Sequence, residues 1–224
     1  MRREQHDAGM TAGMHVQIDL DRANLDARTR LLLFCVVAIQ PADWELFRAS
    51  IRAARERALV RAEFDEALMQ ATLFFGFPRV VTAFEQFQEA WPRTEPSTGL
   101  SVPVEDHFRQ GRALFAAIYG KNDEAVRNKL ASFHQDFHDF VLEAAYGRIL
   151  CRKGLDLLTR ELLATGALAV LDQIPQLVAH ARGAIQFGAT PDAIREVLRC
   201  ARFDDARIDS AMQRIEGERR SAAR

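Results

Sequence analysis

The fold of this chain is decided by residues 155–198, which read LDLLTRELLATGALAVLDQIPQLVAHARGAIQFGATPDAIREVL. Moving the sequence by 130 positions places residues 25–68 on this stretch without a gap, and 11 of the 44 aligned positions are identical. Roughly two or three identities would arise from composition alone, so the pattern predicts an internal duplication. Only two of the identical pairs are acidic, Asp26/Asp156 and Glu66/Glu196.

The duplication predicts two similar lobes that share one core. Residues 1–17 show no periodicity and are expected to form a disordered tail. Residues 18–91 form the first repeat, and residues 92–104, rich in Pro, Ser and Thr, form a linker. Residues 105–216 form the second repeat, and the charged residues 217–224 are expected to fray.

The spacing of apolar residues predicts an all-α fold. Residues 31–39, LLLFCVVAI, could form a buried strand by composition, but the duplicate at residues 161–171, ELLATGALAVL, is typical of a helix. Both are therefore predicted to be buried helices, in two lobes related by an approximate two-fold axis. A later helix is expected to carry an apolar stripe of Phe133, Phe137, Phe140, Val141 and Ala144.

Charge and cysteine content restrict the possible partners and location. The chain has 30 basic and 31 acidic residues, which gives no electrostatic footprint for nucleic acid or an anionic membrane. Small-molecule or protein partners are therefore favoured. Neither a signal-peptide core nor about 20 uninterrupted apolar residues occurs, so a soluble, cytoplasmic protein is expected. Cys35, Cys151 and Cys200 form no C-x-x-C pair, which fits a reducing compartment.

Several motifs of the second half form a recognisable set. They are Thr159-Arg160-Glu161-Leu162, Pro175-Gln176-Leu177, His180, and the run from Gly188 to Val197, with fainter counterparts in Thr29-Arg30, Glu66 and Phe75-Gly76-Phe77-Pro78. In these motifs the chain resembles the carboxymuconolactone decarboxylase family, which shares its all-helical fold with the AhpD-type alkylhydroperoxidases. The resemblance implies cofactor-free lyase chemistry on a small lactone or aromatic-degradation acid. A homo-oligomer is also expected.

The resemblance places His180 and Glu196 in the catalytic acid/base roles. They lie on consecutive predicted helices joined by a turn at Gly188 and could face one another. A histidine can return a proton to the carbon that loses carbon dioxide, and a carboxylate can orient the imidazole. Alternatively, His180 fills a helix seam and Glu196 bonds an arginine or a helix terminus.

Arg160 is the candidate for binding a substrate carboxylate, because a guanidinium can hold a carboxylate through two hydrogen bonds. The alternative is that Arg160 pairs with a nearby acidic residue. Each half departs from the pattern. The first has Leu31 in place of Glu161, Ser50 in place of His180, and Arg57-Ala58 near the expected Gly turn. The second has Ala206-Arg207-Ile208 where the first has Gly76-Phe77-Pro78. These departures leave open a non-catalytic scaffold or ligand-binding protein.

Peroxidase and metal sites are not favoured. A peroxidase needs an attacking thiolate and a nearby resolving thiol, whereas Cys200 follows Glu196 by one helical turn and has no thiol in register. His134 and His138 have the spacing of two helical metal ligands, but the sequence fixes no third ligand, so a solvated helix face is favoured. Neither a metal nor another cofactor is predicted.

Overall fold

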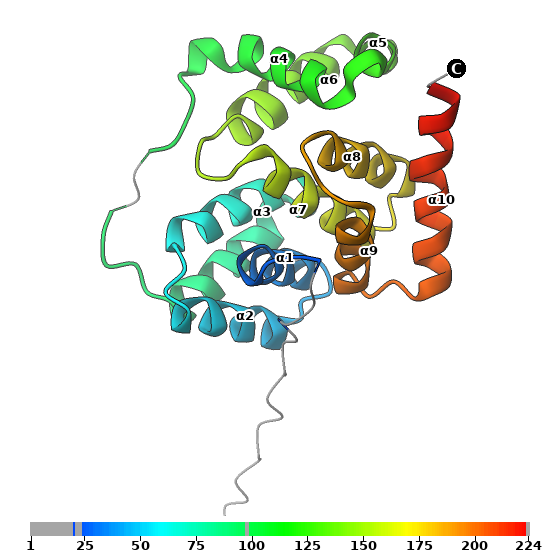
Figure 1. Ribbon diagram of the computed structural model, residues 1–224. Helices are drawn as coiled ribbons and strands as arrows, with labels where there is room; N and C mark the ends of the chain where they lie inside the picture. Colours follow the sequence, from blue (N-terminus) through cyan, green and yellow to red (C-terminus); the bar gives the residue numbers. More distant parts are fainter. Residues whose placement is uncertain (1–19, 21–23, 97–98, 223–224) are drawn as a thin grey trace, which may run out of the picture.

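The computed structural model describes residue 20, residues 24–96 and residues 99–222, and every regular element in this part of the chain is helical (Figure 1). The prediction of an all-α fold is confirmed. The helices in chain order are α1 (Ala27–Ile39), α2 (Trp44–Glu56), α3 (Arg61–Ala90), η1 (Val104–Asp106), α4 (His107–Tyr119), η2 (Gly120–Asn122), α5 (Asp123–Phe133), α6 (Gln135–Phe140), η3 (Val141–Leu150), α7 (Leu157–Val170), α8 (Ile174–Gln186), α9 (Pro191–Cys200) and α10 (Asp205–Ala222). The tail expected at residues 1–17 lies outside the described residues.

Helices α1 and α7 form the centre of the molecule and contact each other. Both are buried on nearly all sides, which explains why their sequences are apolar throughout rather than on one stripe. Each begins with the same cap: Asp26 accepts a hydrogen bond from the Thr29 amide, and Asp156 accepts one from the Thr159 amide. Helix α2 packs on α1, and α8 packs on α7.

Helix positions follow the 130-residue offset found in the sequence. Helix α2 covers residues 44–56 and α8 covers residues 174–186. The turns that precede these helices each hold one residue with positive φ, Ala42 and Asp172, and those that follow them hold Ala58 and Gly188. The same local backbone geometry therefore recurs at corresponding positions of the two stretches.

Helix α3 is sharply bent at Gly76, which has φ 71° and ψ 170°, and it folds back on itself. The rings of Phe64 and Trp91, near its two ends, have centroids 6.0 Å apart, whereas a straight helix of this length would span about 45 Å. Among the described residues this is the one helix long and apolar enough by composition to cross a membrane. Its fold-back and its buried residues identify it instead as part of the core.

Helix α4 and the π-helix η3 pack together around a second, smaller apolar cluster. Their backbones meet so closely that a Cβ atom added at Gly111 would lie 1.9 Å from the Leu142 carbonyl oxygen. The expected apolar stripe of Phe133, Phe137 and Phe140 is wrong, because these side chains are 63%, 48% and 66% exposed. Residues of η3, including Leu142 and Tyr146, take the buried positions instead.

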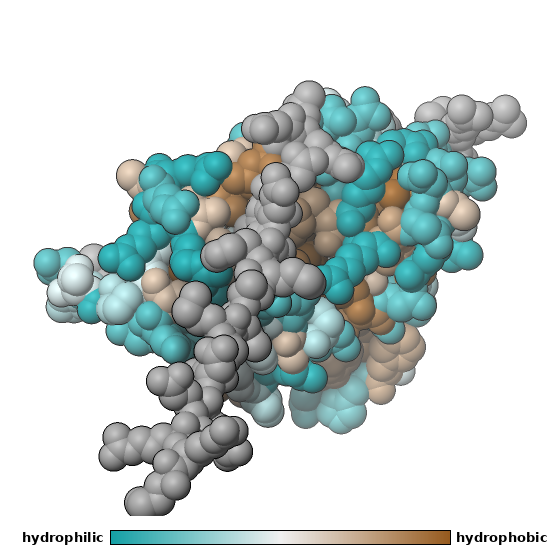
Figure 2. Space-filling view, turned by 90° about the horizontal axis from the view of Figure 1, so that it is seen from below, coloured by the Kyte–Doolittle hydropathy of each residue, from teal (hydrophilic) through white to brown (hydrophobic). Residues whose placement is uncertain are grey.

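The face seen in Figure 2 is largely hydrophilic, with hydrophobic areas between the polar side chains.

Candidate functional site

The candidate site is built around a buried histidine and glutamate on adjacent helices. Nδ1 of His180, on α8, lies 2.9 Å from Oε2 of Glu161, on α7. The Glu161 side chain is 2% exposed and that of His180 is 11% exposed, so the imidazole is the more accessible partner. Because a carboxylate only accepts hydrogen bonds, the proton of this contact lies on Nδ1. Nε2 makes no hydrogen bond within the described residues, so it is the ring nitrogen available to a ligand.

Glu161 controls the protonation of His180. Burial lowers the pKa of His180, but the negative charge of Glu161 and its hydrogen bond outweigh burial and leave the pKa raised. The folded protein therefore favours the imidazolium form more than a free histidine does. A histidine with a raised pKa is suited to donate a proton near neutral pH.

Two tyrosines adjoin this pair. The Tyr146 hydroxyl, on η3, donates a hydrogen bond of 3.3 Å to the Tyr119 hydroxyl at the end of α4. Burial raises the pKa of both tyrosines, and the charge of Glu161 raises each further. Both hydroxyls therefore remain protonated at neutral pH, close enough to Glu161 to feel its charge.

Small and aromatic residues shape the surroundings of the pair. A Cβ atom at Gly183, one turn after His180 on α8, would lie 2.5 Å from Oε2 of Glu161, so a glycine is needed for this approach. Phe74, on α3, contacts the His180 ring edge-on, with centroids 6.4 Å apart. The site therefore joins α3, α4, η3, α7 and α8, which are widely separated in the sequence.

Glu196, expected to face His180, takes part in a different contact. It is buried and forms an ion pair with Nη1 of Arg30 on α1, and Nη1 of Arg199 lies 3.5 Å from its Oε2. The carboxylate that His180 contacts is Glu161, because α7 lies beside α8, whereas Glu196 is directed from α9 toward α1. The structure therefore replaces the expected His180–Glu196 pair with His180–Glu161.

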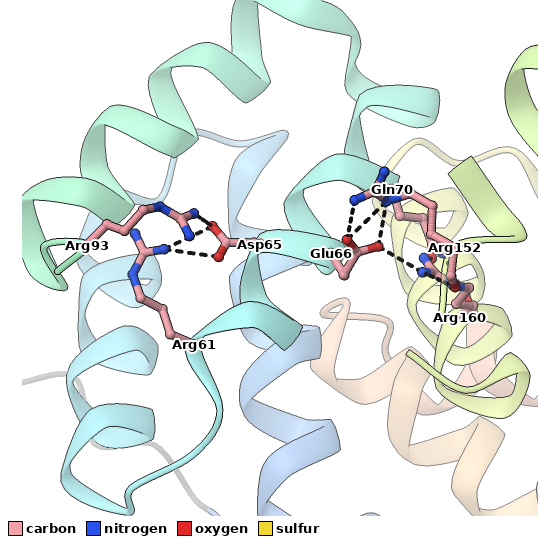
Figure 3. A network of polar contacts seen from close by, with 7 residues as sticks. All are labelled: Arg61, Asp65, Glu66, Gln70, Arg93, Arg152 and Arg160. Atoms are coloured by element: carbon pink, nitrogen blue, oxygen red, sulfur yellow. Dashed lines mark hydrogen bonds and ion pairs between the residues drawn. The ribbon is translucent and has the colours of Figure 1, made fainter. Parts of the chain in front are cut away.

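Arg160 is also buried in an ion pair (Figure 3). Its Nη2 lies 3.0 Å from Oε2 of Glu66 and donates to the Arg152 carbonyl, and its Nη1 donates to Gln70. Arg152 donates to both oxygens of the same carboxylate, from Nη2 to Oε1 at 2.6 Å and from Nε to Oε2 at 2.8 Å. With its side chain 1% exposed and these donors occupied, Arg160 matches the alternative of pairing with an acidic residue.

The two buried arginine–glutamate pairs are reciprocal. Arg30 pairs with Glu196, and Arg160 pairs with Glu66. Arg30 and Arg160 are 130 residues apart, and so are Glu66 and Glu196. Each stretch thus supplies the arginine for the carboxylate of the other.

Glu161 was not among the predicted catalytic residues, although the sequence contained a signal for it. A glutamate inside an otherwise apolar helix needs a buried partner, and both members of the pair differ from their duplicates, Leu31 and Ser50. The serine hydroxyl bonds the Leu46 carbonyl of its own helix. The hydrogen-bonded pair is therefore complete in one half and replaced at both positions in the other.

The cysteines and the His134/His138 pair show no features of a redox or metal site within the described residues. Burial raises the pKa of Cys35 and Cys151, which disfavours their reactive thiolate forms. His134 accepts a hydrogen bond from the Asp136 amide at the start of α6, and Nδ1 of His138 lies 2.7 Å from Oδ1 of Asp139. Within the described residues, no group of three His, Cys, Asp or Glu side chains could hold a metal ion.

Comparisons with known proteins give a consistent result. A sequence model of the carboxymuconolactone decarboxylase family matches residues 135–214, which include Tyr146, Glu161 and His180. The chain is similar to 4-carboxymuconolactone decarboxylase of Acinetobacter baylyi, with 30% identity over 101 residues, covering 44% of this chain and 75% of that protein. It is also similar to Peroxisomal protein 2 of Schizosaccharomyces pombe, with 28% identity over 141 residues. That match covers 58% of this chain and 62% of the yeast protein, less than two thirds of its length.

Proposed function

Because the chain belongs to the carboxymuconolactone decarboxylase family, we propose that it is a cofactor-free lyase that decarboxylates a small lactone or aromatic-degradation acid. The observation that carries this proposal is the buried His180–Glu161 pair beside two tyrosine hydroxyls. Glu161 takes the orienting role that the sequence assigned to Glu196. Arg30 and Arg160 serve to hold helices together rather than to bind substrate.

The proposed reaction is one proton transfer coupled to loss of carbon dioxide. The bond between the substrate carbon and its carboxylate breaks, and its electron pair enters the conjugated lactone as a dienolate. Imidazolium Nε2 of His180 then gives its proton to carbon, and the neutral imidazole regains a proton from water. Glu161 holds Nδ1 and stabilises the imidazolium between turnovers.

Carbon dioxide release from a panel of lactone acids and β-keto acids tests the proposal. We expect His180→Ala to lower turnover by the roughly 10²- to 10⁴-fold typical of losing a general acid. Ser50→Ala, at the duplicate position, is the matched control and should leave turnover unchanged. A His180→Ala protein that melts at lower temperature but turns over normally would identify His180 as a core residue.

The alternative function is a non-catalytic scaffold or ligand-binding protein. It is favoured by the close packing around the pair, where Phe74, Gly183 and the tyrosines surround largely buried side chains. In that case no member of the substrate panel would release carbon dioxide, and His180→Ala would change only stability. A thiol-dependent peroxidase is the least favoured function, given the buried Cys35 and Cys200.

We further propose that the chain arose by tandem duplication, with repeats at residues 18–91 and 105–216 joined by residues 92–104. The common helix bounds of α2 and α8 and the reciprocal ion pairs support this proposal. A cytoplasmic location also remains a proposal, and the name of the yeast relative makes the peroxisome its alternative. Fluorescent tagging distinguishes the two locations.

Assembly into a homo-oligomer remains a proposal as well. The exposed rings of Phe133, Phe137 and Phe140 on α5 and α6 support it, because exposed aromatic side chains are common at protein interfaces. Light scattering of the purified chain would reveal the oligomeric state. A monomer at micromolar concentration would contradict this proposal.

A further inference from the structure

A cavity of about 780 Å³ lies outside the His180 site, between α8, the junction of α4 and α5, and α10. Its volume is within the range of pockets that hold small organic ligands. Figure 1 shows α5, α8 and α10 at this side of the molecule. We call this cavity the groove. Neither His180 nor Glu161 lines it, so it is separate from the proposed acid/base pair.

Within the described part of the chain, the charged side chains that line the groove are all basic. They are Lys121, Lys129, Arg182 and Arg214, although the whole chain has a net charge of −1. Like charges around one cavity raise the local concentration of the opposite ion. The groove therefore favours an anion.

The rest of the lining is mostly aliphatic. The larger of these side chains are Ile118, Val126, Ile174, Val178 and Ile185. Burying the hydrocarbon part of a ligand against such apolar surface is favourable. An anion that fits the groove fully would therefore carry an apolar body as well as its charges.

Hydrogen bonds hold the groove wall in place. Nε and Nη2 of Arg182 donate to the carbonyls of Ile215 and Arg214 on α10, at 3.1 Å and 2.7 Å. Gln186 donates from Nε2 to the Ala117 carbonyl on α4, at 2.6 Å. Helix α8 is thus tied to α10 and to α4, and a preformed site loses less entropy when it binds a ligand.

We propose that this groove is a binding site for an organic dianion with an apolar body, such as a dicarboxylic acid. The two negative groups would engage Lys129 and Arg214, and the hydrocarbon between them would cover the aliphatic floor. This binding is separate from the proposed lyase reaction. It adjoins that site through Tyr119, which lines the groove and accepts the hydrogen bond from Tyr146.

Titration calorimetry of the full chain with decanedioate tests the site directly, with 1,10-decanediol and inorganic phosphate as comparison ligands. We expect decanedioate to bind more tightly than either, since the diol lacks the charges and phosphate lacks the apolar body. The double variant Lys129→Gln/Arg214→Gln should weaken decanedioate binding by at least about tenfold. Both residues are exposed, so the fold should be retained, which a melting curve checks.

The matched control is Arg148→Gln/Lys153→Gln, which removes two exposed positive charges outside the groove. Its affinity for decanedioate should equal that of the unmodified protein. Absence of decanedioate binding, equal affinity for the diol or for phosphate, or an equal loss in both double variants would overturn the proposal. Because no turnover is measured, an inactive lyase would leave this result unaffected.

Discussion

Replacing the His180–Glu161 pair by the residues of its duplicate, serine and leucine, measures how strongly the pair is coupled. His180→Ser leaves a buried carboxylate without its partner, which costs about 3–5 kcal/mol of unfolding free energy. Glu161→Leu leaves the buried imidazole without its carboxylate. The double variant Glu161→Leu/His180→Ser removes both polar groups, and loss of both partners is less costly than loss of one.

We therefore expect the double variant to be more stable than the sum of the single effects predicts, by about 1.5–3 kcal/mol, the value of a hydrogen bond to a charged group. The space left by serine occurs in both variants that carry it and cancels in the double-mutant cycle. Urea unfolding of the four proteins at pH 6 supplies the measurement. A coupling below about 0.5 kcal/mol, the usual limit of additivity, would refute the reasoning.

The pH dependence of this coupling provides a second test of the same pair. The folded pKa of His180 is raised above its ordinary value of 6.5, so the imidazolium contributes its full stability below pH 6.5. That contribution is lost as pH rises through the folded pKa. The coupling should therefore decrease at alkaline pH, and a coupling that is the same at pH 6 and pH 10 would contradict a contribution from the titration of His180.

Three other changes have defined outcomes. Gly183→Ala should displace the Glu161 carboxylate and lower turnover with little change in global fold, which activity and circular dichroism would show; unchanged turnover would contradict the tight approach. Cys200→Ser should leave native activity intact, whereas peroxide reduction that disappears in this variant would place the protein among the peroxidases. Burial raises the pKa of Glu66, but its arginine partners outweigh burial and leave the pKa lowered. The unfolding free energy that this carboxylate contributes should therefore be lost as pH falls below about 4.5. In denaturant unfolding across this pH range, Arg160→Met should lose less unfolding free energy than the unmodified protein.

The periodic parts of the sequence predicted the fold well. Asp26 and Asp156 are local caps whose role follows from residues three positions away, and the helices that they begin are the central α1 and α7. The fold-back of α3 is harder to predict, because the contact between Phe64 and Trp91 depends on the direction of the bend at Gly76. A sequence pattern fixes where a helix breaks, but packing fixes where its second part goes.

The site was predicted less completely because its partners are set by neighbouring helices rather than by neighbouring residues. His180 and Glu196 are closer in sequence than Arg30 and Glu196, yet Arg30 is the partner of Glu196. The hydroxyls of Tyr119 and Tyr146, 27 residues apart, meet only because α4 and η3 pack closely. Such contacts follow from helix packing, which the spacing of residues along the chain does not specify.

The exchange of arginines between the two stretches has a consequence for how the chain can be divided. The region that matches the family model, residues 135–214, contains Arg160 and Glu196 but not Glu66 and Arg30, their ion-pair partners on α3 and α1; beside Glu196 it keeps Arg199. Cut out alone, this region would lose both of these buried ion pairs, a cost of several kcal/mol for each pair broken. We therefore expect that residues 135–214 do not fold independently of the first stretch. Fragments that contain the first and the second stretch, expressed separately, should remain unstructured alone and fold together when they are mixed, because each supplies the ion-pair partners of the other.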